Sequence, residues 1–275
     1  MSEFSKLSSP QSTTEELQKH KFDIRSQVWK ELRKVAYPDS RFHYNFAEFI
    51  ADFQGSDNST KLILDSDFFK ESVQNNGNNN NNHKNLIFIT PDNCLESLRY
   101  ELLKMGIPFL MTTYGIFRGF FIVDPAKIDP KLYKYASTLD GMEKLSTHVS
   151  LNEIKQLNIF VPLMITGTGA INDKGIRFGK GHGFFDLEWA MLSMINALDL
   201  NKTKCVAVVH DVQLLSGIEL NPEIFDTVCD FIVTNSKLIK VDNAKKPNCG
   251  VIWDLLAPGM LQDIEPLSEL YEMTH

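Results

Sequence analysis

The sequence GIRFGKGHGFFD, residues 175–186, lies between a strongly apolar segment and a segment with helical periodicity. The apolar segment, residues 159–165, predicts a buried strand, and residues 185–198 predict a helix. Glycines crowd between them, at Gly175, Gly179, Gly181 and Gly183. Glycine adopts positive φ angles and lets the backbone approach a ligand, and the first N–H groups of a helix are unpaired donors. The stretch therefore predicts a phosphate-binding loop in an α/β fold.

Charged residues within this stretch favour the same interpretation. Arg177 and Lys180 add two cations, and Asp186 stands at the helix start, where it could cap the helix or hold Mg²⁺ beside a phosphate. Neither the Walker A motif nor the Rossmann fingerprint fits, because Gly181 follows Lys180 and Phe184 occupies the third glycine position. The alternative is a flexible turn with coincidental charges. It is disfavoured because glycines, cations and a helix-opening carboxylate coincide after an apolar strand.

The rest of the chain alternates apolar strand candidates with helical segments. The further strand candidates are residues 86–90, 108–111, 119–123, 205–210, 231–234 and 251–256. A helix is predicted over about residues 95–106. This alternation predicts a mostly parallel sheet with helices on both faces, in a single α/β domain over residues 15–275. Residues 75–82, NNGNNNNN, predict a low-complexity insert in a surface loop of that domain.

An N-terminal helix is predicted from Glu15 to Val35, after a polar segment, residues 1–14, that we expect to be a disordered tail. Lys21 and Arg25 project close to the apolar stripe of this helix, so both cations aim at its inner side. One interpretation is a snorkelling pair, or a salt bridge with a core carboxylate. The other is a phosphate clamp that meets the glycine loop in space. The residues alone leave both open.

A further candidate pair, His210 and Asp211, closes the apolar segment 205–210. Ligands sit at the carboxyl ends of strands in open parallel sheets, so the carboxylate of Asp211 could be a second Mg²⁺ ligand. The alternative is a capped strand end with a hydrogen-bonded His210, and without other information it is the preferred interpretation.

Composition sets limits on the function. The formal net charge of -7 argues against a nucleic-acid-binding protein, because phosphate backbones reward an excess of Lys and Arg. The four cysteines form no C-x-x-C pair. No apolar run approaches the ~20 residues that span a bilayer, and the polar N-terminus lacks the apolar stretch of a signal peptide. We therefore expect a reduced, cytoplasmic, monomeric protein without a membrane partner.

These motifs together resemble the 5-formyltetrahydrofolate cyclo-ligase family. Its pattern G-x-R-x-G-x-G-x-G-[YF]-[YF]-D is present at residues 175–186, and its K-x-x-x-R is present as Lys21 and Arg25. Its downstream Asp, followed by D-x-[IV]-[IV]-T, is similar to Asp211 and residues 230–234. The resemblance implies an ATP- and Mg²⁺-dependent closure of 5-formyltetrahydrofolate to 5,10-methenyltetrahydrofolate. In that reaction the formyl oxygen attacks the γ-phosphate, N10 attacks the activated carbon, and phosphate leaves.

The resemblance also implies roles for single residues. The implied ATP-binding residues are Lys21, Arg25, Arg177, Gly179, Lys180, Gly181, His182 and Gly183. The implied Mg²⁺ ligands are Asp186 and Asp211. The implied substrate contacts are Asp92, Phe184 and Phe185, and the two Phe residues stand where the family usually has Tyr.

The folate half of the chain departs from the family pattern. Asp92 stands where the enzymes usually have Glu, and residues 137–158 lack the expected aromatic residue and Glu-Pro pair. Residues 179–198 are closer to a divergent branch, the methenyltetrahydrofolate synthase domain-containing proteins. Some members of that branch carry a C-terminal RNA-recognition module, for which little room follows Val251.

Three hypotheses follow from this sequence. The first is an active cyclo-ligase that binds ATP and a reduced folate. The second is a relative that binds nucleotide without folate chemistry, for which RNA is a disfavoured but open partner. The third is a kinase or ligase that uses the same loop for another substrate.

Overall fold

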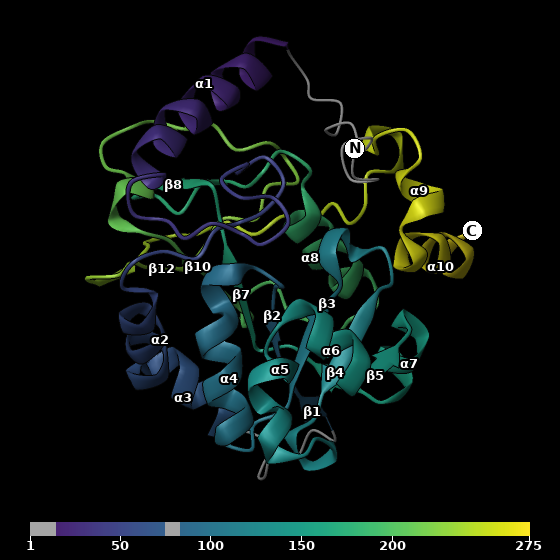
Figure 1. Ribbon diagram of the computed structural model, residues 1–275. Coiled ribbons are helices and arrows are strands. Elements are labelled where there is room, and N and C mark those ends of the chain that lie inside the picture. Colours follow the sequence, from purple (N-terminus) through teal and green to yellow (C-terminus); the bar gives the residue numbers. More distant parts are fainter. Residues whose placement is uncertain (1–14, 75–82) are drawn as a thin grey trace.

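The structure is a computed structural model that describes residues 15–74 and 83–275. Within these ranges, an eight-stranded sheet forms the centre of the molecule, and helices lie on both of its faces (Figure 1). The predicted tail at residues 1–14 and the Asn-rich insert at residues 75–82 lie outside the described residues. None of the described helices is both long and apolar enough to cross a membrane.

The central sheet is mostly parallel, as predicted. Its strand order is β13-β12-β10-β7-β2-β3-β4-β5, in which β12, β10, β7, β2 and β3 pair in parallel. These strands are Phe231–Val233 (β12), Lys204–Val208 (β10), Leu163–Gly167 (β7), Ile87–Ile89 (β2) and Phe109–Thr112 (β3). Antiparallel pairing adds Leu238–Lys240 (β13), Phe120–Val123 (β4) and Thr147–Val149 (β5) at the edges. Every residue of β2, β3 and β7 is buried, because both faces of the sheet are covered.

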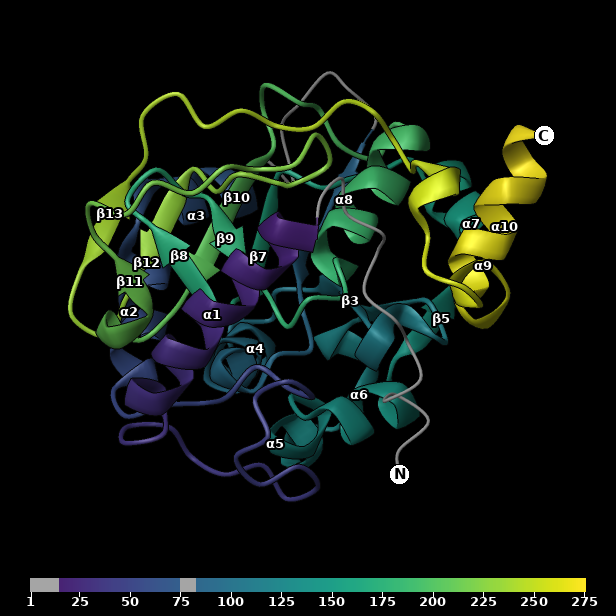
Figure 2. The same cartoon turned by 90° about the horizontal axis from the view of Figure 1, so that it is seen from above.

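Alternate strand residues feed two hydrophobic cores, one on each face of the sheet. Ile87 and Ile89 pack into one core, and Phe88 packs into the other. The helices that cover the two cores lie on opposite sides of the sheet (Figure 2). On the first face the helices are Ser56–Asp65 (α2), Asp67–Gln74 (α3), Glu96–Lys104 (α4), Tyr133–Ala136 (α5) and Leu139–Leu145 (α6). On the second face they are Leu151–Gln156 (α7), Phe184–Met194 (α8) and Glu265–Thr274 (α10).

A second, three-stranded sheet lies beyond the carboxyl end of β7. It consists of Leu214–Leu215 (β11), Ala170–Asn172 (β8) and Arg177–Phe178 (β9), in the order β11-β8-β9. The N-terminal helix, Glu15–Leu32 (α1), packs Ile24 and Val28 against this sheet, as its apolar stripe predicted. The glycine loop therefore does not follow the central strand directly, because the β8–β9 hairpin intervenes.

Two strand predictions need correction. Residues 159–165 form two short strands, Ile159–Phe160 (β6) and β7, because Pro162 between them has no N–H for a ladder bond. Residues 251–256 were predicted as a strand but contain a 3₁₀ turn, Trp253–Leu255 (η7), followed by Met260–Asp263 (α9) and α10. This apolar segment packs with α8 in the second core, so its side chains are covered without joining the sheet.

Candidate functional site

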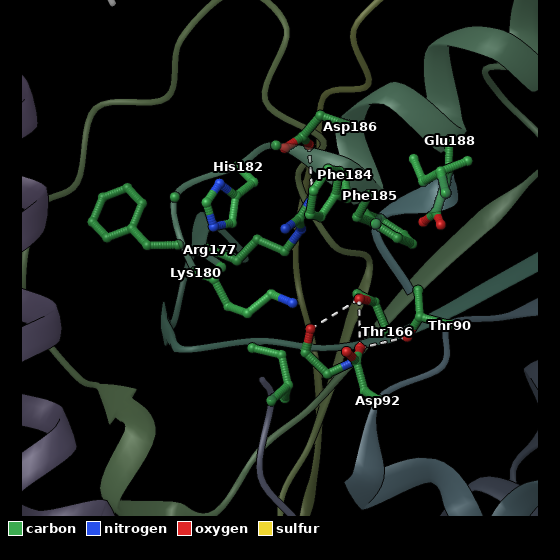
Figure 3. Close-up of a pocket in the computed structure, with 18 of the residues that line it drawn as sticks. Thr90, Asp92, Thr166, Arg177, Lys180, His182, Phe184, Phe185, Asp186 and Glu188 are labelled. Carbon is green, nitrogen blue, oxygen red and sulfur yellow. Dashed lines mark hydrogen bonds and ion pairs between the residues drawn. The ribbon is translucent and has the colours of Figure 1, made fainter. Parts of the chain in front are cut away.

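A pocket opens at the carboxyl ends of β2, β3 and β7, where parallel sheets commonly bind ligands. Its cavity has a volume of about 120 Å³. The glycine loop, residues 179–183, forms one wall, and the segments that follow β2 and β3 form the opposite wall. Figure 3 shows Lys180 and His182 on one side of this pocket and Asp92 and Glu188 on the other. We call the side with Lys180 and His182 the cationic half and the side with Asp92 and Glu188 the acidic half, and the lining also includes the acids Asp186, Glu223 and Asp226.

The glycine loop has the backbone that its sequence predicted. Gly181 and Gly183 adopt φ angles of 111° and 69°, values that side-chain-bearing residues rarely adopt. Gly183 is the N-cap of α8 and leaves the start of this helix without a side-chain cap. The pocket is lined from Gly183 to Asp186, so the uncapped, partly positive end of α8 lies at the cavity.

Lys180 carries a buried amine in the cationic half. Its Nζ lies 4.0 Å from the centre of the Tyr114 ring and donates a hydrogen bond of 3.2 Å to the carbonyl oxygen of Glu48. No carboxylate of the described residues forms a salt bridge with it. Burial lowers the pKa of Lys180 to about 8, and the more distant Asp92 only partly opposes this shift. An anion that enters the pocket would stabilise the charged form of this buried amine.

Helix α1 brings Arg25 to the same cavity. Its side chain is buried, and its Nε has no hydrogen-bond partner among the described residues. Burial also lowers the pKa of this guanidinium. The placement brings Arg25 to the cavity that the glycine loop lines, and binding of phosphate there stays a prediction. Lys21 belongs to α1, but its side chain lies outside the described part of the chain.

His182 is a neutral group whose pKa both of these cations affect. Its ring stacks on Phe184 with 5.3 Å between the ring centres, and its Nδ1 has no partner among the described residues. Burial, and then the charges of Lys180 and Arg25, lower the pKa of His182 to about 4. His182 therefore offers a neutral imidazole, while Phe184 lines the pocket beneath it.

Arg177 and Asp186 form a buried ion pair with each other. The Nη2 of Arg177 lies 2.6 Å from Oδ1 of Asp186, and the same oxygen accepts a 2.8 Å bond from the N–H of Thr227. The guanidinium lies over Phe185, 4.5 Å from the ring centre. All three predicted site residues line the pocket, but the cation and the carboxylate neutralise each other.

Asp211 lies outside this pocket lining. Its Oδ1 accepts a 2.9 Å hydrogen bond from Ser236, and its N–H donates to the side chain of Asn235. The Nδ1 of His210 accepts the N–H of Val212, which matches the alternative of a capped strand end with a hydrogen-bonded His.

The described residues do not form a metal site that could hold Mg²⁺. They contain no group of three or more His, Cys, Asp or Glu side chains placed to hold a metal ion. Of the two predicted ligands, Asp186 is paired with Arg177, and Asp211 is not among the residues that line the cavity.

Asp92 lies in the acidic half, where it joins two strands of the sheet. Its Oδ2 accepts hydrogen bonds from the hydroxyl of Thr90 and, at 2.8 Å, from the N–H of Gly167 at the end of β7. The buried Arg99 donates to the carbonyl oxygens of Thr90 and Asp92 and so fixes the same segment. Asp92 lines the cavity as predicted, but its Oδ2 is already bonded within the protein.

Sequence reasoning missed Glu188, which lies on α8 and also lines the cavity. The residue is 2% exposed, and its Oε1 accepts a 2.5 Å bond from the hydroxyl of Thr112. Burial raises the pKa of Glu188 to about 8, so the carboxyl is mostly protonated at neutral pH. The available signal was a single carboxylate within an apolar helix, because a buried acid needs a partner or a function.

The chain is similar in sequence to known proteins. Residues 78–235 match the 5-formyltetrahydrofolate cyclo-ligase family. The chain is 28% identical over 254 residues to a methenyltetrahydrofolate synthase domain-containing protein of Danio rerio, with 91% of this chain and 61% of that protein covered. The Homo sapiens protein of the same name is 27% identical over 259 residues, with the same coverage. The chain thus spans about three fifths of the length of these relatives.

A solved structure is also similar in part. The NMR structure of Aquifex aeolicus 5,10-methenyltetrahydrofolate synthetase aligns with a TM-score of 0.45 and 13% identity. The alignment covers 82% of this chain and 95% of that one.

Proposed function

Because the chain belongs to the 5-formyltetrahydrofolate cyclo-ligase family, we propose that it closes 5-formyltetrahydrofolate to 5,10-methenyltetrahydrofolate with ATP. The observation that carries the proposal is one cavity in which Lys180, on the glycine loop, lies opposite Asp92 and Glu188. The cationic half suits the phosphates of ATP. The acidic half, which also contains threonine hydroxyls, suits the polar ring of a reduced folate.

In this proposal the protein acts by positioning and by neutralising charge. The uncapped start of α8 donates backbone N–H groups to phosphate oxygens. Arg25 and Lys180 supply the positive charge that balances the γ-phosphate as the formyl oxygen attacks it. The neutral His182 supplies hydrogen bonding rather than charge. Mg²⁺ would enter with the nucleotide, and we assign no step to a metal held by the protein.

The test is the formation of methenyltetrahydrofolate, followed by its absorbance, from 5-formyltetrahydrofolate and Mg·ATP. Wild-type protein should give an ATP-dependent rise, and Lys180→Met should lower the rate by about 100-fold, a typical loss for a group that stabilises transition-state charge. The matched control is Lys104→Met, because Lys104 is an exposed lysine of α4 that pairs with Glu101. A wild-type protein that gives no ATP-dependent product would refute the proposal.

The state of Asp92 favours a second candidate, a nucleotide-binding relative without folate chemistry, because Oδ2 of this implied folate contact is already bonded within the protein. A cavity of about 120 Å³ is smaller than the roughly 300–1,000 Å³ of common ligand pockets. Two substrates would therefore require the loop to move. Calorimetry with Mg·ATP and with 5-formyltetrahydrofolate separately distinguishes the candidates. Nucleotide binding without folate binding supports the second candidate. A titration with RNA in the same buffer tests whether the protein binds RNA.

A further inference from the structure

The acidic half of the pocket contains a carboxyl oxygen that the fold does not use. Oε1 of Glu188 accepts the hydroxyl of Thr112, but Oε2 is buried and has no hydrogen-bond partner among the described residues. Glu188 lines the cavity, and its side chain is nearly inaccessible to solvent. A buried polar atom without a partner costs free energy unless a ligand or a bound water completes it.

The neighbouring carboxylate cannot take this role as freely. Oδ2 of Asp92 already accepts bonds from the hydroxyl of Thr90 and the N–H of Gly167, which hold the ends of β2 and β7 together. A ligand that bound this oxygen would compete with the hydrogen bonds from Thr90 and Gly167. Glu188 can accept a ligand without breaking a bond within the protein.

We propose that Glu188 selects the head group of the substrate by binding a ring edge on which a C=O and an N–H lie side by side. The inference rests on the proposed folate chemistry, because the pyrimidinone ring of a reduced folate carries such an edge. The carboxyl Oε2–H donates to the ring C=O. The ring N–H donates to Oε1, which has a second lone pair beside its bond from Thr112. Thr112 thus fixes the carboxyl in the orientation that the ring needs.

Two substitutions at this position separate hydrogen bonding from packing. Glu188→Gln keeps a donor and an acceptor, whereas Glu188→Met fills a similar volume with neither. Glu188→Met should weaken binding of 5-formyltetrahydrofolate, and of pterin used as the isolated head group, by about 10- to 100-fold. Glu188→Gln should stay within about threefold of wild type, because it retains both hydrogen bonds. Both variants should bind Mg·ATP as wild type does.

The control is Glu101→Met, which removes a partly exposed carboxylate of α4 outside the pocket lining and should change neither affinity. In steady state, Glu188→Met should raise the KM for folate and leave the KM for ATP unchanged. The infrared C=O band of the protonated acid, assigned by its loss in Glu188→Gln, should shift when pterin binds. If Glu188 had only a structural role, its substitution would change stability but would not raise the KM for folate alone, and pterin would not shift the infrared band.

The outcomes separate the two proposals. If wild-type protein forms product and Glu188→Met keeps the wild-type KM for folate, this inference is wrong and the proposed function stands. If no product forms but pterin binds to wild type and not to Glu188→Met, the proposed function is wrong and this inference stands. If wild type binds neither 5-formyltetrahydrofolate nor pterin, both are overturned.

Discussion

Arg177 and Asp186 stand at opposite ends of the glycine loop and are joined across it by a buried ion pair of 2.6 Å. Arg177 is the first residue of β9 in the small sheet, and Asp186 lies in the first turn of α8. The pair therefore fastens the two stems of the loop to each other. The family resemblance implied that these two residues bind ATP and Mg²⁺, but in the structure they bind each other and hold the shape of the candidate site.

The first prediction concerns this pair. Asp186→Asn should lower the free energy of unfolding by about 3–5 kcal/mol, because it leaves a buried guanidinium without a counter-charge. Arg177→Met combined with Asp186→Asn should recover part of this loss. Chemical denaturation of the single and double variants measures the coupling. Strictly additive losses would show that the two side chains act independently.

The second prediction concerns the loop backbone. Gly181→Ala and Gly183→Ala should each cost about 1 kcal/mol or more of stability, because both positions need a positive φ. Both should also weaken binding of Mg·ATP in calorimetry. Gly106→Ala is the matched control, since Gly106 also has a positive φ, of 72°, but lies outside the pocket lining, and an added Cβ meets nothing within 4 Å. It should cost similar stability and leave Mg·ATP binding unchanged, and an equal loss of binding at all three positions would contradict this explanation.

The third prediction concerns the charge on Lys180. Its pKa is lowered to about 8, so the free protein loses this charge as the pH rises through that value. Binding of Mg·ATP should therefore weaken above about pH 8, approaching tenfold per pH unit. Calorimetric titrations between about pH 7.5 and 9.5 should show that the affinity for Mg·ATP falls with pH in the wild type. In Lys180→Met the affinity should not change with pH. The titration is repeated in Glu188→Gln, because Glu188 faces the same cavity and titrates in the same range.

The fourth prediction concerns Arg25. Arg25→Met should weaken Mg·ATP binding by about tenfold or more, because a charged hydrogen bond to phosphate is lost. Its free energy of unfolding should stay equal or rise, since the variant removes a buried charge whose Nε has no partner among the described residues. Arg41→Met, at a half-exposed arginine, is the control for net charge. A large loss of stability in Arg25→Met would point to a structural role.

The fifth prediction concerns stability and pH. The pKa of Glu188 is raised by burial from 4.5 to about 8, so the folded protein holds a proton that the unfolded chain releases. Stability from this group is complete below about pH 4.5 and declines as the pH rises towards 8. Wild type should lose about 1.4 kcal/mol per pH unit relative to Glu188→Gln across this window. Denaturation at several pH values measures the slope, and parallel curves for the two proteins would contradict it.

The sequence by itself determined the local structure of the site. Apolar runs with helices between them predicted the parallel sheet, and glycines ahead of a helical segment predicted the loop with positive φ angles. The position of Arg25 in the helical period placed this cation on the inner side of its helix, whereas the same prediction for Lys21 falls on a side chain outside the described ones. These features follow from the period of side chains and from the steric freedom of glycine, which act over a few neighbouring residues.

The tertiary structure alone decided which of these groups meet. The packing of α1 on the small sheet carried Arg25 to the glycine loop, and the fold left Asp211 outside the pocket lining. The same packing paired Arg177 with Asp186 and buried Glu188 beside Thr112. Burial and charge pairing depend on contacts between segments far apart in the chain. Periodicity tells that a side chain faces inward, but only the assembled fold decides what it faces.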